Sequence, residues 1–279
     1  MNNKHFNLMK SAINSVINST ENLNSIFICS RGGLSKTTTT VNLLKASGKE
    51  FVYISSYSTP VEFVNFIYKN KGKIIVFDDF ESIWTSGVKM INILKACLWG
   101  VGSENKRIVS YLTTDKRLTA PAQFEFSGKL IFLLNKIPKN NDSILGALLS
   151  RALVYEMNIP YKDTIEILRS FIEKDYKTIK KAERKEILDF LLDNTDESYL
   201  DDLNFRTLIK LYDLYLTNPT NWKDLSFMVF KRDENIYILK KYLSETKSVF
   251  EAQKKFTKET GLSRATFFRH KAKLGLKNV

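Results

Sequence analysis

One segment near the start of the chain combines residue types that bind phosphate. The apolar run Ser25–Cys29 leads into Ser30-Arg31-Gly32-Gly33-Leu34-Ser35-Lys36-Thr37, and helix-forming residues continue to Ala46. A loop at a helix N-terminus directs backbone N–H groups at an anion, its lysine reaches the outer phosphates of a nucleotide, and its threonine hydroxyl binds Mg²⁺. The expected phosphate contacts are Gly32, Gly33, Leu34, Ser35, Lys36, Thr37 and Thr38, with Thr37 also a magnesium ligand.

This loop departs from the usual phosphate-binding pattern at two positions. The pattern places glycine at both ends of the loop, whereas this chain has Ser30 and Ser35 there. Both serines still offer a backbone N–H, and Gly32 and Gly33 keep the middle of the loop flexible. Two interpretations therefore stay open: a loop that holds ATP for hydrolysis, or a degenerate core that binds nucleotide without hydrolysis or is inert.

A second apolar run ends in a group of carboxylates. Residues Lys73–Phe77 are followed by Asp78, Asp79 and, after one phenylalanine, Glu81. A carboxylate at the end of a buried strand can hold the shell of a magnesium ion, and a second one can orient an attacking water. We assign the first role to Asp78. The second belongs to either Asp79, which stands where glutamate is more usual, or Glu81.

Apolar β-type runs and helical stretches alternate through the first half of the chain, and this alternation specifies a parallel sheet covered by helices. The expected strands are Ser25–Cys29, Phe51–Ser55, Lys73–Phe77, Lys129–Leu134 and Ala152–Met157. An amphipathic helix over residues 5–17 is expected to pack on this sheet. After Pro160 the pattern predicts only helices, over Lys162–Lys174, Lys181–Leu192 and Phe205–Leu216.

Three further segments complete a resemblance to the AAA+ ATPases. The run Phe124–Lys136, with Asn135 near its end, resembles the sensor 1 strand of that class. The segment around Arg151 resembles its arginine-finger segment, and the segment around Arg206 resembles its sensor 2 helix. All five elements occur in the AAA+ order between about residues 20 and 216, and the resemblance is closest to the compact AAA+ ATPases of phages and other mobile elements.

The resemblance implies an ATPase that uses ATP and Mg²⁺. Asn135 would hydrogen-bond the attacking water or the γ-phosphate, and Arg206 would reach the γ-phosphate from a helical lid. Arg151 would reach the nucleotide of a neighbouring subunit and stabilise the transition state. An arginine that acts in trans implies a homo-oligomer, either a filament or a ring such as a hexamer.

A basic hairpin is expected between the acidic strand and the sensor 1 strand. Residues Arg107–Thr113 and Gln123–Phe126 can pair, with Lys116 and Arg117 near the tip. AAA+ helicases and initiators often carry a hairpin at this place, and some use it on DNA. The sequence leaves two interpretations open, a DNA contact through Lys116 and Arg117 or a purely structural hairpin.

The C-terminal segment has the pattern of a DNA-binding domain. Three helices are predicted over Asn235–Ser244, Val249–Thr260 and Arg264–Leu274, with Gly261 able to end the second and Ser263 able to cap the third. The run Thr260–Gly275 resembles the turn and recognition helix of resolvase-type helix-turn-helix domains. Phe267 and Leu274 are expected to face inward. The candidate contacts to the major groove are Arg264, Thr266, Arg269, Lys271 and Lys273.

The charge distribution agrees with a polyanion partner at this end. Residues 221–279 carry 14 Lys and Arg against 6 Asp and Glu, a net charge of +8 out of +13 for the whole chain. No run approaches the roughly 18 apolar residues of a membrane-spanning helix. We therefore expect a cytoplasmic protein, in the host cytoplasm if it is viral, that binds duplex DNA.

These observations predict an α/β chain with an AAA+ parallel-sheet core over residues 1–158, a helical lid over 159–220 and a three-helix domain over 221–279. The expected function is an oligomeric ATPase that acts on DNA in replication initiation, helicase loading or transposition, with a helicase or recombinase as an expected partner. Two alternatives stay open: a DNA-binding regulator with a degenerate core, and an ATPase that remodels a protein partner.

Overall fold

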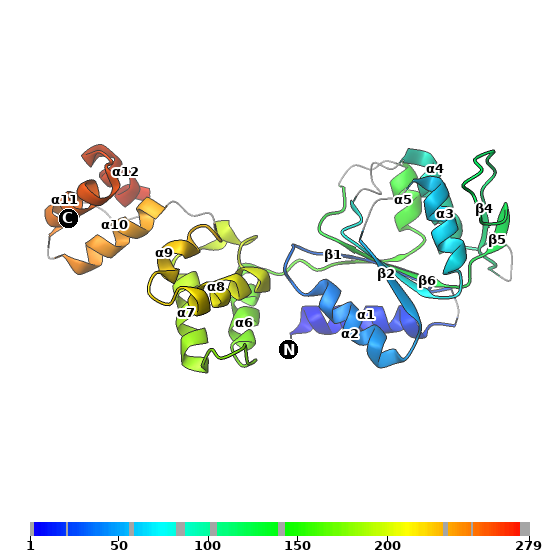
Figure 1. Cartoon of the computed structure of the whole chain (residues 1–279), viewed down its shortest axis with the longest axis horizontal. Coiled ribbons are helices and arrows are strands. Elements are labelled where there is room, and N and C mark those ends of the chain that lie inside the picture. Colours follow the sequence, from blue (N-terminus) through cyan, green and yellow to red (C-terminus); the bar gives the residue numbers. More distant parts are fainter. Residues whose placement is uncertain are drawn as a thin grey trace. The chain divides into compact units, whose positions relative to one another are not determined.

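The computed structural model describes residues 3–20, 22–55, 59–81, 87–100, 105–138, 143–230, 234–246 and 248–273 (Figure 1). The chain divides into two units, Met1–Ile167 and Leu168–Val279, while the division into three domains stays a prediction. Helix α6 (Tyr161–Phe171) contains the border between these two units. Within the described ranges, no helix is both long enough and apolar enough to cross a membrane.

The first unit is built on a sheet of five parallel strands, in the order β2-β3-β6-β1-β7. Its strands are β1 (Ser25–Cys29), β2 (Phe51–Ile54), β3 (Ile74–Asp78), β6 (Lys129–Leu134) and β7 (Leu153–Glu156). The three central strands are almost entirely buried because helices cover both faces, which explains their continuous apolar sequences. The predicted parallel sheet is confirmed, and each strand lies within two residues of its expected bounds.

Helices cover the two faces of the sheet (Figure 1). Helices α1 (Lys4–Asn18) and α2 (Lys36–Ser47) lie on one face, and α3 (Pro60–Lys69), α4 (Gly87–Leu98) and α5 (Ser143–Leu149) lie on the other. The predicted packing of the first helix is confirmed, since the five apolar side chains of the expected stripe, Phe6, Met9, Ile13, Val16 and Ile17, are buried. On the opposite face the rings of Phe27, Phe77 and Phe132 form a stack, with Phe132 at centroid distances of 4.3 Å from Phe27 and 5.0 Å from Phe77.

A short antiparallel pair projects beside α4. Strands β4 (Ile108–Ser110) and β5 (Gln123–Glu125) form the hairpin that the sequence predicts, with Val109 paired to Phe124. Arg107 anchors its base, because its buried guanidinium donates to the carbonyl groups of Cys97, at 3.0 Å, and of Gly128, at 2.7 Å. The hairpin is therefore fixed to the sheet, while the loop at its far end is presented to solvent.

The regular elements of the second unit, within its described residues, are helices. Its first part contains α7 (Lys181–Asp193), the 3-10 turn η2 (Glu197–Tyr199), α8 (Phe205–Thr217) and α9 (Trp222–Ser226). Helices α10 (Glu234–Glu245), α11 (Val249–Thr260) and α12 (Arg264–Lys273) follow and enclose a separate small core around Leu239, Phe256 and Phe267. The inward position of Phe267 is confirmed, whereas Leu274 lies outside the described residues.

The turn between α11 and α12 has the expected chemistry. Gly261 has a φ of +69°, a left-handed conformation that favours glycine, and its N–H donates to the carbonyl of Thr257 at 3.0 Å. Ser263 accepts a hydrogen bond from the N–H of Thr266 at 3.2 Å and so caps α12. A three-residue turn therefore joins the last two helices.

Candidate nucleotide-binding site

The strand order brings three chain segments to one edge of the sheet. Strand β6 lies between β1 and β3, and the carboxyl ends of parallel strands meet at the same edge. The glycine-containing loop follows β1, Asp78 ends β3, and Asn135 follows β6. Residues far apart in the sequence are therefore neighbours in the folded chain.

Lys36 lies at the centre of this cluster. Its Nζ donates to the carbonyl oxygens of Ser30 at 2.7 Å and Arg31 at 3.1 Å, and to Oδ1 of Asn135 at 3.1 Å. The residue is only 7% exposed. Burial lowers the pKa of Lys36, while the nearby Cys29, Asp78, Asp79 and Glu81 oppose that shift. The loop carbonyl groups thus surround the positive charge of Lys36. The phosphate oxygens of a bound nucleotide can replace these carbonyl groups as its hydrogen-bond acceptors.

Thr37 and Asp78 form the second part of the cluster. The Thr37 hydroxyl donates to Oδ2 of Asp78 at 2.7 Å, and the Asp79 N–H donates to Oδ1 of the same carboxylate at 3.2 Å. Hydroxyl and carboxylate oxygens are the ligands that Mg²⁺ prefers. The donor set of this pair therefore fits the magnesium site that the sequence predicts.

Asn135 donates hydrogen bonds to two further carboxylates, those of Asp79 and Glu81. Its side-chain Nδ2 donates to Oδ1 of Asp79 at 3.0 Å, and its backbone N–H donates to Oε1 of Glu81 at 2.6 Å. Asp79 is exposed and has a φ of +49°, in the left-handed region. Such strain is found at functional sites, where the surrounding structure holds a residue against its backbone preference.

The loop backbone adopts the shape that glycine normally supplies. Ser35 has a φ of +57° and Gly33 a φ of +71°. Leu34 is 1% exposed, so only its backbone can face a phosphate. Gly32 is half-buried, and Thr38 is exposed in the first turn of α2. Ser35, which stands at the second glycine position of the usual pattern, thus keeps the loop shape by adopting a strained left-handed backbone.

Two residues at the site carry contacts that the sequence motifs do not indicate. The hydroxyl of Tyr53 on β2 donates to Oδ2 of Asp78. The guanidinium of Arg31 donates to the carbonyl oxygen of Ile159 and to Oγ1 of Thr164, both at 3.0 Å. Both contacts depend on how strands and helices pair in three dimensions, so residue types along the chain carry no signal for them.

The two predicted arginines belong to other elements of the chain. Arg151 follows α5, is half-buried, and donates through Nη1 to the carbonyl of Ala147 in that helix. Arg206 is exposed in the first turn of α8, which belongs to the second unit. The structure therefore gathers Lys36, Thr37, Asp78, Asp79, Glu81 and Asn135, and the roles of Arg151 and Arg206 stay predictions.

Two solved structures resemble the whole chain. A point mutant of RuvB from Thermotoga maritima is 12% identical and has a TM-score of 0.51, with 99% of this chain and 88% of that one covered. DnaA from Aquifex aeolicus with bound AMPPCP is also 12% identical with a TM-score of 0.51, and the match covers 99% of this chain and 89% of that one. The chain has the AAA+ fold. No protein-family model matches the sequence, and no curated protein matches it significantly.

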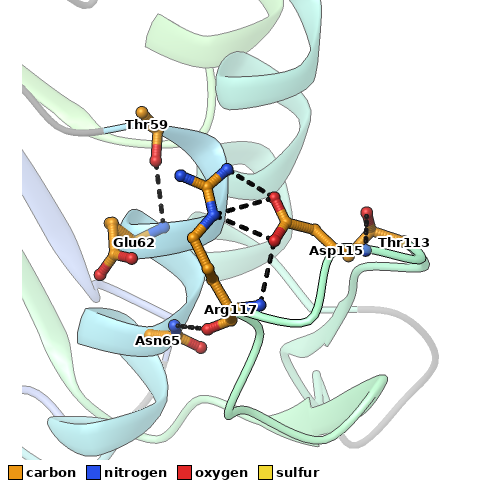
Figure 2. A network of polar contacts seen from close by, with 6 residues as sticks. All are labelled: Thr59, Glu62, Asn65, Thr113, Asp115 and Arg117. Atoms are coloured by element: carbon orange, nitrogen blue, oxygen red, sulfur yellow. Dashed lines mark hydrogen bonds and ion pairs between the residues drawn. The ribbon is translucent and has the colours of Figure 1, made fainter.

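The hairpin of this AAA+ core has an ordered loop (Figure 2). The Arg117 guanidinium forms an ion pair with Asp115, at distances from 2.6 to 3.2 Å, and these hydrogen bonds lower the pKa of Asp115 to about 2. Asn65 of α3 holds the loop by donating to the carbonyl of Arg117 at 2.8 Å. Arg117 therefore helps to shape the loop, and both Arg117 and the neighbouring Lys116 are exposed.

The predicted DNA contacts on α12 divide into two groups. Arg264 and Arg269 are exposed, and Arg269 donates to Oγ1 of the half-buried Thr266 at 3.1 Å. Lys271 was expected to project away from the core, but this residue is 5% exposed, and its contact with DNA stays a prediction. Lys271 lies four residues after the buried Phe267, a spacing that places both on the inward face of the helix. The side chain of Lys273 lies outside the described residues.

Replacing Ser35 by glycine tests the strain in the loop. A non-glycine residue in the left-handed region costs about 1–2 kcal/mol, and glycine loses about 0.5–1 kcal/mol through backbone entropy. The Ser35 side chain makes no capping hydrogen bond that would be lost. We therefore expect Ser35→Gly to raise the free energy of unfolding of the first unit by about 0.5–1 kcal/mol, measured by denaturant unfolding.

Ser30→Gly is the matched control, because its Oγ donates to the carbonyl of Arg31 at 3.2 Å and Ser30 has no positive φ. Ser30→Gly should give no gain in stability. Equal gains in both variants would contradict the idea that strain at Ser35 is specific.

Proposed function

We propose that this chain is an ATPase that hydrolyses ATP with Mg²⁺ and acts on DNA as a homo-oligomer. The observation that carries the proposal is the convergence of Lys36, Thr37, Asp78 and Asn135 at the carboxyl edge of a parallel sheet. Lys36 would bind the outer phosphates, and Thr37 and Asp78 would hold Mg²⁺. Bound Mg²⁺ supplies positive charge that neutralises the phosphates.

The geometry favours a hydrolysing core over a degenerate one. Ser35 reaches the left-handed conformation that the usual glycine would adopt, so the loop keeps its shape. Asp79 is exposed and oriented by Asn135, which suits a group that polarises an attacking water, whereas Glu81 receives the backbone N–H of Asn135 and so holds the end of β6 in place. We assign the water-orienting role to Asp79 and a positioning role to Glu81.

Charge and exposure support DNA as the partner of the C-terminal helices. The last 59 residues hold most of the net positive charge, and α12 presents Arg264 and Arg269 to solvent after a three-residue turn. Arginine suits both phosphate contact and bidentate recognition of guanine. We propose a helix-turn-helix that reads duplex DNA through α12, with Lys116 and Arg117 in the hairpin loop as a second contact.

Within this proposal the biological setting is a phage or other mobile element, and the process is replication initiation, helicase loading or transposition. A helicase or a recombinase is the proposed protein partner. Arg206 would reach the γ-phosphate from the helical lid. An alternative is a DNA-binding regulator that binds ATP without hydrolysing it, which the serines at positions 30 and 35 favour.

Lys36→Ala tests the nucleotide site. We expect ATP affinity to fall by at least about 10-fold, because a charge-assisted hydrogen bond contributes about 1.5–3 kcal/mol. Lys45→Ala, at an exposed lysine of the same helix, is the control and should bind ATP normally. The measurements are calorimetric ATP binding and circular dichroism. Unchanged ATP affinity in a folded Lys36→Ala protein would rule out the proposed nucleotide site. Tight ATP binding without hydrolysis in the wild type would favour the alternative of a DNA-binding regulator.

Arg151→Ala tests action between subunits. Arginine fingers contribute on the order of 10³-fold or more to phosphoryl transfer, so we expect ATP binding to persist and hydrolysis to fall by about that factor. Mixing Arg151→Ala with Asp78→Ala should restore part of the activity, because each variant supplies what the other lacks at a shared site. Full hydrolysis by Arg151→Ala alone would rule out the assignment.

Arg264→Ala and Arg269→Ala test the DNA surface in the full chain. Each should weaken binding to duplex DNA by about 1–3 kcal/mol if it reads a base edge, and affinity should fall steeply with salt. Lys181→Ala removes an exposed charge from the lid and serves as the charge-matched control. Fluorescence anisotropy at two salt concentrations measures both effects. Equal losses in all three variants would point to bulk charge, and a wild-type chain without salt-dependent binding would favour a protein partner.

A further inference from the structure

Tyr53 lies on the edge strand β2, outside every motif described above. It pairs with Val76 of β3, and residues two apart on a strand point to the same face, so the side chains of Tyr53, Val76 and Asp78 share one face of the sheet. A strand advances about 3.3 Å per residue. The long phenol side chain can therefore lean along the sheet to the carboxylate two residues beyond its pair, and its hydroxyl donates to Oδ2 of Asp78.

Within the described residues, three donors hold the Asp78 carboxylate. Oδ2 accepts from the Thr37 hydroxyl at 2.7 Å and from the Tyr53 hydroxyl, and Oδ1 accepts from the Asp79 N–H at 3.2 Å. Asp78 is 7% exposed, and a buried charge is costly unless it is hydrogen-bonded. Of these donors, only the Tyr53 hydroxyl comes from outside the two nucleotide motifs.

The chemistry of the phenol suits a permanent donor. A tyrosine phenol ordinarily has a pKa of about 10. The hydroxyl therefore keeps its proton near neutral pH and gives a hydrogen bond to the carboxylate. Phenylalanine at the same place would fill nearly the same volume and leave Oδ2 with one donor fewer.

We propose that Tyr53 is a positioning residue that orients the Asp78 carboxylate for Mg²⁺, an inference that rests on the proposed ATPase function. Hydrogen bonds to a metal ligand fix its orientation, and their removal typically lowers metal affinity by about 10–100-fold. Edge strand β2 thus takes part in the site through one hydroxyl, although it contributes no residue to the phosphate loop or to the acidic strand.

Tyr53→Phe removes only that hydroxyl. We expect the Mg²⁺ concentration for half-maximal binding of a fluorescent ATP analogue to rise by about 10-fold, whereas binding of the analogue in EDTA stays unchanged because Lys36 is intact. Tyr155→Phe is the matched control, since Tyr155 lies on the opposite edge strand β7 and its hydroxyl donates to the carbonyl of His5 at 2.9 Å. Its Mg²⁺ dependence should equal that of the wild type.

Two results would overturn the inference while leaving the ATPase standing. One is a Tyr53→Phe protein with the wild-type Mg²⁺ dependence. The other is an equal loss of binding with and without Mg²⁺, which would place the effect on the loop rather than on the metal carboxylate. If wild-type protein shows no Mg²⁺-dependent binding at all, the proposed ATPase function fails, and the inference fails with it.

Discussion

A buried lysine charge is the constraint on which the rest of this site depends. Removing an ammonium group from water is costly, and the cost is met only if acceptors surround it. The carbonyl groups of Ser30 and Arg31 and the amide oxygen of Asn135 supply those acceptors around Lys36. Because Asn135 follows β6, this third acceptor reaches Lys36 through the pairing of β6 with β1. The strand order and the charge are therefore linked.

The same strand order explains why the carboxylates gather there. Strand β3 pairs with β6 on the side away from β1. Asp78 and Asp79, at the end of β3, therefore lie beside Asn135, and Asp79 accepts a hydrogen bond from it. The side-chain oxygen of Asn135 accepts a hydrogen bond from Lys36, and its side-chain nitrogen donates one to Asp79. One amide side chain thus connects the cationic loop to the acidic turn, and it does so with both of its polar atoms.

The sequence predicted the parts of this structure that local patterns determine. Apolar runs such as Lys129–Leu134 and the stretch around Lys36 identify buried strands and a phosphate loop because burial and loop chemistry impose residue types locally. The partners of Tyr53 and Arg31 could not be predicted, since they depend on sheet register and on helix packing. Lys271 was expected to project outward because lysines in a basic helix are usually exposed. Its place one turn after Phe267 turns it inward instead.

The burial of Lys271 removes one positive charge from the solvent-facing side of α12. Each neutralised phosphate contributes a slope of about −0.9 to the dependence of log affinity on log salt. In the described part of α12, Arg264 and Arg269 are the cationic residues that face solvent. Several copies joined in one assembly would place many such weak contacts on the same duplex, and the resulting avidity can exceed the affinity of a single contact surface by about 10²–10⁴-fold.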